Sequence, residues 1–249
     1  MMTFVKPLAL GLMMATPAAA FDMGAMTPAE RQDFRAEIRE YLMENPEVLM
    51  EAIGVLEQRQ AQQQAVADDA MVLSQADALY SDINSWEGGN PEGDITLVEF
   101  VDYRCGYCRK AHSEVEELVS TDGNIRLIVK EFPILGEASV VASRFAIATK
   151  LTLGDDAYKA AHDALISMRA DVNEASVRKL ARSLGLDADV IVAKMNSPEV
   201  SAVITANRQL GQQLQINGTP TFVMQNEMVR GYVPLDGMRD MIAEIRQQG

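Results

Sequence analysis

The pattern of apolar and polar positions divides this sequence into a helical first part and a mixed second part. Between residues 27 and 80, apolar residues recur three or four positions apart, which predicts helices. Beyond residue 80, short runs of β-branched and aromatic residues alternate with helical patterns. Alternation of this kind is typical of an α/β fold. We therefore predict an α-helical arm over residues 21–80 and an α/β domain over residues 81–249.

The predicted arm consists of two helices. Residues 27–30 form a capping box with proline at the first helical position, and Asn45-Pro46 separates this helix from the next. The second helix carries a seam with 4-3 spacing, formed by Leu49, Ile53, Leu56, Gln60, Gln63, Ala67 and Ala70. Such a seam favours association with other copies of the chain through residues 27–80. The alternative is that the arm packs on the domain that follows it.

The second part begins with a turn-rich junction, residues 81–94, and continues with a strand–helix–strand order. Ile95–Val101 is typical of a strand buried on both faces, and a helix beginning at Cys105 leads to a second strand over residues 124–132. This order predicts a parallel pair of strands. The remaining predicted elements are a helical insertion at about residues 136–215, a hairpin of residues 217–224 and 228–233, and a helix over residues 235–245.

Cys105 and Cys108 stand where the first strand meets its helix, and they are the only 2 cysteines of the chain. Free N–H groups and the helix dipole favour negative charge at a helix start, so the pKa of the Cys105 thiol should fall. Cys108 lies one turn further along the helix, within reach of a disulfide. The pair is therefore predicted to cycle between dithiol and disulfide, with Cys105 as the exposed nucleophile and Cys108 protected.

Two other readings of the cysteine pair fit the sequence less well. A structural zinc site needs four nitrogen or sulfur ligands, and only His112 and His162 are available to complete one. Their spacing from the cysteines is a poor match to zinc fingers. A purely structural disulfide would close a very short loop and constrain little of the unfolded chain. Redox chemistry is the favoured reading.

Glu99 interrupts the apolar run of the first strand, six residues before Cys105. A partly buried carboxylate beneath the pair would have a raised pKa and could relay a proton to or from Cys108. The alternative is a solvent-facing position on an edge strand. Lys130, in the second strand, would neutralise Glu99 if it pointed inward, although an exposed lysine at a strand end is more common.

The start of the chain indicates export, and its net charge restricts the possible partners. Residues 1–20 combine Lys6, a short apolar stretch and three small residues at 18–20, which is the pattern of a secretory signal peptide; a retained N-terminal anchor is the alternative. The apolar stretch is too short to span a bilayer. A net charge of −14 argues against nucleic acid or an anionic membrane as a partner. An oxidising compartment outside the cytoplasm suits a redox-active pair.

The order of elements resembles the thioredoxin fold, with Cys105-Gly106-Tyr107-Cys108 at the first strand–helix junction and Gly218-Thr219-Pro220 at the hairpin. Within that fold, residues 81–249 are similar to the DsbA-like family of exported thiol:disulfide oxidoreductases, which carry a helical insertion at the same place. The resemblance implies that Pro220 is cis and lies, with Thr219, against the cysteine pair. It also implies that Glu99 is the buried acid of the family.

The arm and the domain together also resemble the suppressor-of-copper-sensitivity (ScsC) and Com1-like branch, through the run Asn45-Pro46-Glu47-Val48-Leu49. Some members of that branch trimerise through the arm and act as isomerases, so a trimer is the expected oligomer. Gly106-Tyr107 replaces the Pro-His of DsbA itself, and with it a histidine that helps to make DsbA strongly oxidising. Thr219 before the proline is similar to the disulfide isomerases. Isomerase or reductase activity is therefore favoured.

The resemblance implies a periplasmic enzyme that forms, reduces or isomerises disulfides in unfolded or misoxidised exported proteins. A membrane redox partner is expected to restore the pair, and no metal or organic cofactor is implied. The expected site residues are Cys105, Cys108 and Glu99 for catalysis and Gly106, Tyr107, Thr219 and Pro220 for substrate binding. A competing hypothesis is a non-catalytic chaperone or copper-binding protein that holds Cu(I) with the same two thiols.

Overall fold

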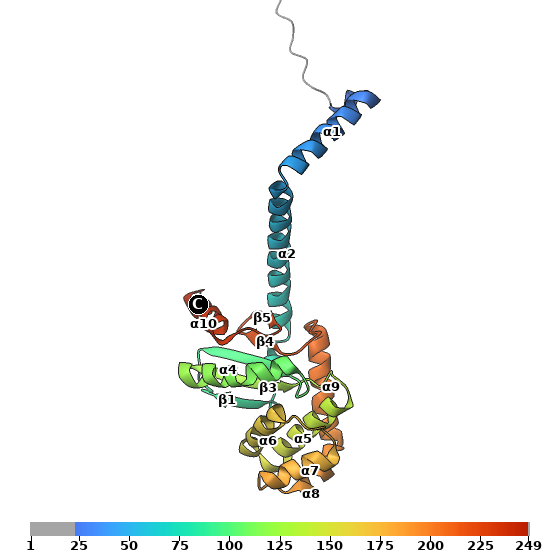
Figure 1. Ribbon diagram of the computed structural model, residues 1–249. Coiled ribbons are helices and arrows are strands. Elements are labelled where there is room, and N and C mark those ends of the chain that lie inside the picture. The colour runs from blue at the N-terminus through green and yellow to red at the C-terminus, as the bar shows by residue number, and fades with distance from the viewer. Residues whose placement is uncertain (1–22, 249) are drawn as a thin grey trace, which may run out of the picture. The chain divides into compact units, whose positions relative to one another are not determined.

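The computed structural model describes residues 23–248 of the chain (Figure 1). The predicted signal peptide, residues 1–20, lies outside this range. The chain divides into two compact units, Met1–Arg59 and Gln60–Gly249, and the division falls inside one long helix. The arm predicted over residues 21–80 therefore extends into the second unit.

The first unit contains a short 3-10 turn, Met23–Ala25, the helix α1 (Pro28–Glu44) and the beginning of α2 (Glu47–Ser74). The predicted capping box is present, because the Thr27 hydroxyl accepts from the Glu30 backbone N–H and the Glu30 carboxylate accepts from the Thr27 backbone N–H. No residue of α1 is buried. The exposed apolar residues of the two helices include Phe34, Ile38, Tyr41, Leu49, Ile53 and Leu56.

The second unit is built on a five-stranded sheet of order β1-β3-β2-β4-β5, in which only β2 and β3 are parallel. The strands are β1 (Trp86–Gly89), β2 (Ile95–Val101), β3 (Ile125–Glu131), β4 (Thr221–Met224) and β5 (Glu227–Arg230). The helices are α3 (Ala76–Tyr80), α4 (Gly106–Asp122), α5 (Glu137–Leu153), α6 (Asp155–Ser167), α7 (Glu174–Ser183), α8 (Ala188–Met195), α9 (Pro198–Gln213) and α10 (Leu235–Gln248). This is the predicted thioredoxin fold, with α5–α9 inserted between β3 and β4 (Figure 1).

Side chains of the central strands alternate between two apolar layers. Leu97 and Val101 of β2 belong to the layer that also contains buried residues of α4, α5 and α6. Val98 and Phe100 belong to a second layer, with buried residues of α3, α9 and the end of α2. Because successive side chains of a strand point to opposite faces, Glu99 lies on the first face, beneath α4. The sheet therefore fixes which polar residues can meet beside the cysteine pair.

Lys130 meets neither expectation from the sequence. It is fully buried (0%), and its ammonium donates to the Asp82 carboxylate and to the Ala78 carbonyl oxygen, both at 2.8 Å. Lys130 is paired with Phe100 in the parallel register, so its side chain lies on the face away from Glu99. The lysine therefore ties α3 and the segment after it to the sheet, instead of neutralising Glu99.

Two predicted segments differ in the structure. The junction over residues 81–94 contains the edge strand β1, which pairs antiparallel with β3 and stacks Trp86 on Tyr158 at a centroid distance of 5.9 Å. Its two glycines conceal the strand in the sequence, because glycine is depleted in strands. The second strand of the hairpin ends at Arg230 and not at residue 233, because Gly231 has φ +94° and leaves the extended conformation.

The last part of the predicted arm is a component of the second unit. Val72 and Leu79 are fully buried (0%) in the layer beneath β2. Asp68 pairs with Arg230 of β5, with a hydrogen bond of 2.9 Å. Deletion of residues 21–80 would therefore expose the core and not leave a folded domain, and a truncation that removes the arm should end at residue 59.

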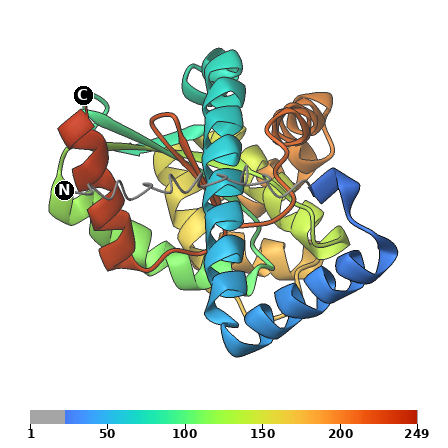
Figure 2. The same cartoon turned by 90° about the horizontal axis from the view of Figure 1, so that it is seen from above.

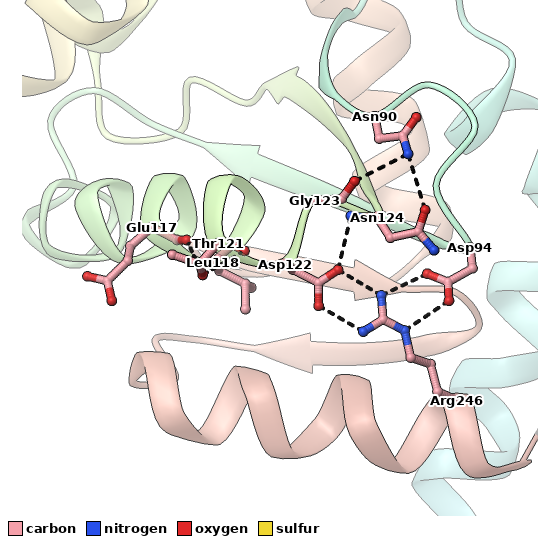
Figure 3. Close-up of polar contacts among 9 residues, drawn as sticks. All are labelled: Asn90, Asp94, Glu117, Leu118, Thr121, Asp122, Gly123, Asn124 and Arg246. Atoms are coloured by element: carbon pink, nitrogen blue, oxygen red, sulfur yellow. Dashed lines mark hydrogen bonds and ion pairs between the residues drawn. The ribbon is translucent and has the colours of Figure 1, made fainter.

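Arg246 links three elements at one edge of the second unit (Figure 3). Its guanidinium donates to the carboxylates of Asp94, which precedes β2, and Asp122, which ends α4, over distances of 2.8–2.9 Å. Figure 2 shows α10 and α4 on the same side of the sheet. The arginine thus anchors α10 to the helix that carries the cysteine pair.

Among the described helices, none is long and apolar enough to cross a membrane.

Replacement of Arg246 by lysine should lower the free energy of unfolding by about 1 kcal/mol, since an ammonium cannot bond two carboxylates in the same fork geometry. Urea unfolding measures the change. Arg239→Lys on the same helix is the matched control, because Arg239 is more exposed (42%) and makes single contacts with Glu117 and Asp236. Equal losses in the two variants would contradict this assignment.

Candidate active site

Cys105 is the N-cap residue of α4, with an extended backbone (φ −75°, ψ 122°). The central strand β2 ends at Val101 and a short turn delivers the cysteine to the helix start. The Cys105 sulfur accepts a hydrogen bond from the backbone N–H of Cys108 at 3.5 Å, as an N-cap oxygen would. The cysteine therefore occupies the position of the helix that most favours negative charge.

The surroundings of Cys105 favour its thiolate. A hydrogen bond with the Cys108 thiol is the largest influence, and it lowers the pKa of Cys105 to about 5 against the opposing effect of burial. The Thr219 carbonyl lies 3.0 Å from the sulfur and accepts its proton when the thiol is neutral. At neutral pH, Cys105 is therefore predominantly a thiolate, which is the form that attacks disulfides.

Cys108 has the opposite environment. It is completely buried (0%), whereas Cys105 is 8% exposed. The hydrogen bond with Cys105, burial and the nearby Glu99 charge raise the pKa of Cys108 far above its ordinary value. The predicted division between a reactive and a protected cysteine agrees with this geometry, but Cys105 is less exposed than expected because the Thr219 carbonyl faces its sulfur.

The segment before β4 contacts the cysteine pair. The Thr219–Pro220 peptide bond is cis, as the resemblance implied. The carbonyl of Pro220 accepts from the Gly231 N–H at 2.9 Å. This segment lies next to Cys105 because β4 runs antiparallel to β2, with Thr221 opposite Phe100, so the start of β4 adjoins the end of β2.

Gly106 and Tyr107, between the cysteines, are exposed. The Tyr107 ring, 63% exposed, stacks on Tyr232 at a centroid distance of 6.1 Å. Lys110 places its ammonium 4.1 Å from the centroid of the Tyr232 ring. An aromatic surface of Tyr107 and Tyr232 thus adjoins the reactive sulfur and offers an apolar contact to a bound chain.

Glu99 is buried (3% exposed) because β2 lies between β3 and β4, so the edge-strand alternative is wrong. Burial raises the pKa of Glu99 to about 7; His112 opposes this shift, and the charges of Glu131 and Cys105 add to it. A carboxyl group that titrates near neutral pH beside a high-pKa thiol is suited to proton transfer.

Glu131 is a second buried acid that the sequence reading missed. It is 3% exposed, and burial raises its pKa to about 7. The hydroxyls of Tyr103 and Tyr158 donate to Glu131 Oε1 at 2.6 and 2.7 Å. The parallel register pairs Glu131 with Val101, so alignment of the two predicted strands was the signal that could have found it.

Asp102 was also missed, and it fixes the turn that precedes Cys105. Its fully buried carboxylate accepts hydrogen bonds from the backbone N–H groups of Arg104, Ile134 and Leu135 over 2.8–3.0 Å. These bonds join the turn before α4 to the loop after β3. The Asp102 carbonyl also accepts from the Cys105 N–H at 3.0 Å, so Asp102 positions Cys105 directly.

The two histidines weighed as zinc ligands do come together, but not with the cysteines. His112 on α4 and His162 on α6 have ring centroids 5.2 Å apart. Asp163 completes the group, and neither cysteine is part of it. The Cys2His2 alternative, which the sequence already disfavoured, is therefore absent from the described part of the chain.

Comparison with known proteins identifies the family. Residues 96–243 match the DSBA-like thioredoxin domain, and residues 30–63 match the copper resistance protein ScsC N-terminal domain. The chain belongs to the DSBA-like thioredoxin-domain family. The members of this family are thiol–disulfide oxidoreductases.

Two solved structures agree with this assignment, and a curated relative matches the chain over part of its length. A thioredoxin-like oxidoreductase from Silicibacter pomeroyi DSS-3 is 43% identical, with a TM-score of 0.65 over 69% of this chain and 97% of that one. Proteus mirabilis ScsC in a transitional conformation is 28% identical, with a TM-score of 0.64 over 90% of this chain and 98% of that one. The Na+/H+ antiporter NhaA 3 of Salinispora tropica is 25% identical over 143 residues, 57% of this chain. The chain spans only 22% of that antiporter's length.

Alkylation of the reduced protein should label Cys105 with a midpoint near pH 5 and leave Cys108 unmodified, because only Cys105 combines a pKa of about 5 with access to solvent. Iodoacetamide pulses from pH 4 to 8, followed by peptide mass spectrometry, measure both rates. In a Cys105→Ser control, Cys108 should label slowly throughout. Faster labelling of Cys108 in the wild type would refute the assignment.

Glu99→Gln should change how stability depends on pH. An acid with a folded-state pKa of about 7 and an ordinary value of 4.5 destabilises the folded state progressively as pH rises through this interval. The stability of the variant relative to wild type should therefore grow between pH 4.5 and 7, by about 1–3 kcal/mol. Urea unfolding of both reduced proteins measures it, and the same pair in a Cys105→Ser background removes the coupled Cys105 charge. Exposed Glu92→Gln is the control for the loss of a carboxylate at the surface. A flat Glu99→Gln difference would contradict the prediction.

Proposed function

We propose that this chain is an exported thiol–disulfide oxidoreductase that rearranges disulfides in unfolded or misoxidised proteins. One observation carries the proposal: Cys105, with a pKa of about 5, lies at the start of α4 against Thr219, and buried Cys108 lies one turn away. In this arrangement Cys105 is the attacking thiolate, and Cys108 is a protected thiol that can resolve the mixed disulfide.

In the proposed reaction, the Cys105 thiolate attacks one sulfur of a substrate disulfide. An S–S bond forms to Cys105, and the other substrate sulfur leaves as a thiolate. When another substrate thiolate attacks the mixed disulfide, a new substrate disulfide forms and Cys105 returns as thiolate, with no net oxidation. When Cys108 attacks instead, its proton passes to Glu99, the substrate leaves reduced, and Cys105 and Cys108 become a disulfide.

The surroundings of the pair support binding of an extended chain. Pro220 has no backbone N–H, and the Thr219 backbone can pair with an extended substrate segment. Gly106 leaves open space above the start of α4, since apart from its chain neighbours and its own helix nothing lies within 4 Å of the position that a Cβ would take. Tyr107 adds an exposed aromatic contact. These features favour unfolded clients.

The exposed apolar residues of α1 and α2 support self-association, with a trimer as the proposed state. Several linked active sites raise the effective concentration of reactive thiolates around one client. Rearrangement requires a second attack on the same client, whereas simple oxidation does not. We propose that the enzyme acts in the periplasm and that a membrane redox partner restores Cys105 and Cys108.

A second candidate function is Cu(I) binding by Cys105 and Cys108, since residues 30–63 match a domain of a copper resistance protein. Two thiolates suit Cu(I). Copper titration of the reduced protein, beside insulin reduction and reactivation of scrambled ribonuclease, separates the two functions. Tight Cu(I) binding without turnover in either assay would favour the copper function.

Removal of the arm through residue 59 should give a monomer that loses at least about tenfold in reactivation of scrambled ribonuclease and keeps dithiol oxidation. Light scattering and the two assays measure this. In the full chain, Ile53→Asp on the apolar seam should have the same effect, and Gln58→Asp off the seam should have none. A monomeric full-length protein, or a truncation that isomerises as well as the parent, would overturn this role for the arm.

A further inference from the structure

The only 2 histidines of the chain meet on neighbouring helices. His112 on α4 and His162 on α6 lie with their ring centroids 5.2 Å apart, and Asp163 is beside them. One ring nitrogen of each histidine and one Asp163 carboxylate oxygen lie within 4.8 Å of one another. The proposed disulfide chemistry uses none of these three residues.

One edge of this group already has the dimensions of a metal site. His112 Nε2 and Asp163 Oδ1 are 3.3 Å apart, which equals the separation of two ligands about a tetrahedral ion with bonds of about 2.0–2.1 Å. Asp163 Oδ1 is buried and receives no well-aligned hydrogen bond from any described residue. Lys159 holds the other carboxylate oxygen, Oδ2, so Oδ1 remains directed at the histidines.

Tyr103 and ionised Glu131 favour one tautomer of His162. The Tyr103 hydroxyl donates its single proton to Glu131 at 2.6 Å and lies 2.9 Å from His162 Nδ1. While Glu131 is ionised, the hydroxyl oxygen accepts from Nδ1–H, and the lone pair of the ring is on Nε2. A ligand histidine whose second nitrogen donates into a carboxylate-linked hydrogen bond is the usual arrangement around protein-bound metals.

We propose that His112, His162 and Asp163 bind a divalent transition-metal ion, Zn2+ or Cu2+, with a fourth coordination position open to solvent. Two imidazoles and one carboxylate suit these borderline ions, whereas Ca2+ and Mg2+ prefer oxygen ligands and Cu(I) prefers sulfur. The ion can enter from the Asp163 side, since that side chain is 39% exposed. The site is distinct from the thiols, although His112 follows Cys108 by one turn of α4.

The test uses the full chain with Cys105→Ser and Cys108→Ser, so that the thiols cannot bind the ion. Zn2+ alone and Cu2+ alone are titrated by calorimetry, and thermal unfolding is followed with and without each ion. One equivalent of at least one ion should bind and raise Tm. His112→Gln and Asp163→Asn should each weaken binding at least about tenfold. Asp155→Asn, on the same helix and paired with Lys150, is the matched control and should bind as the parent does.

Tyr103→Phe distinguishes a site of three ligands, which includes His162, from binding by His112 and Asp163 alone. The variant keeps all three ligands but removes the hydroxyl that orients His162, so binding should weaken by about 10–100-fold. Circular dichroism confirms that each variant is folded. The proposal is overturned if the thiol-free chain binds neither ion more tightly than Asp163→Asn does, or if binding is unchanged in folded His112→Gln.

Discussion

The active site depends on the position of β2 between β3 and β4. This strand is buried on both faces, and its carboxyl end delivers Cys105 to the start of α4. The antiparallel pairing of Phe100 with Thr221 brings the Thr219–Pro220 segment to the same edge. The parallel pairing with β3 places Glu131 at that edge as well. A nucleophile, a covering backbone segment and buried acids thus meet because of one strand's neighbours.

Local sequence signals predicted much of this arrangement. The capping box at Thr27, the apolar run of β2 and the cysteine spacing each depend on residues close together in the chain, where propensity and hydrogen-bonding rules are strongest. The fold class followed from the order of these elements. The edge strand β1 was not predicted because its pairing with β3, and not the propensity of its own residues, defines it.

The rest depended on contacts between distant residues. The direction of Lys130 follows from which layer each face of the sheet meets, which no local pattern states. Glu131 Oε1 accepts from two tyrosines, and the Asp102 carboxylate accepts from a loop; both sets of partners are far away in the sequence. The predicted end of the arm was wrong for the same reason, because Asp68 pairs with Arg230, which is 162 residues further along the chain. Heptad spacing continues through α2, although buried residues occur only near the end of the helix, at Asp68 and Val72.

The small exposure of Cys105 has a consequence for the other proteins of its compartment. Only 8% of the residue is accessible, and the Thr219 carbonyl faces its sulfur. If the chain acts as proposed, a disulfide in a flexible segment reaches that sulfur more readily than one held in a rigid surface. Rigid, folded proteins would then be spared without any recognition of their sequence.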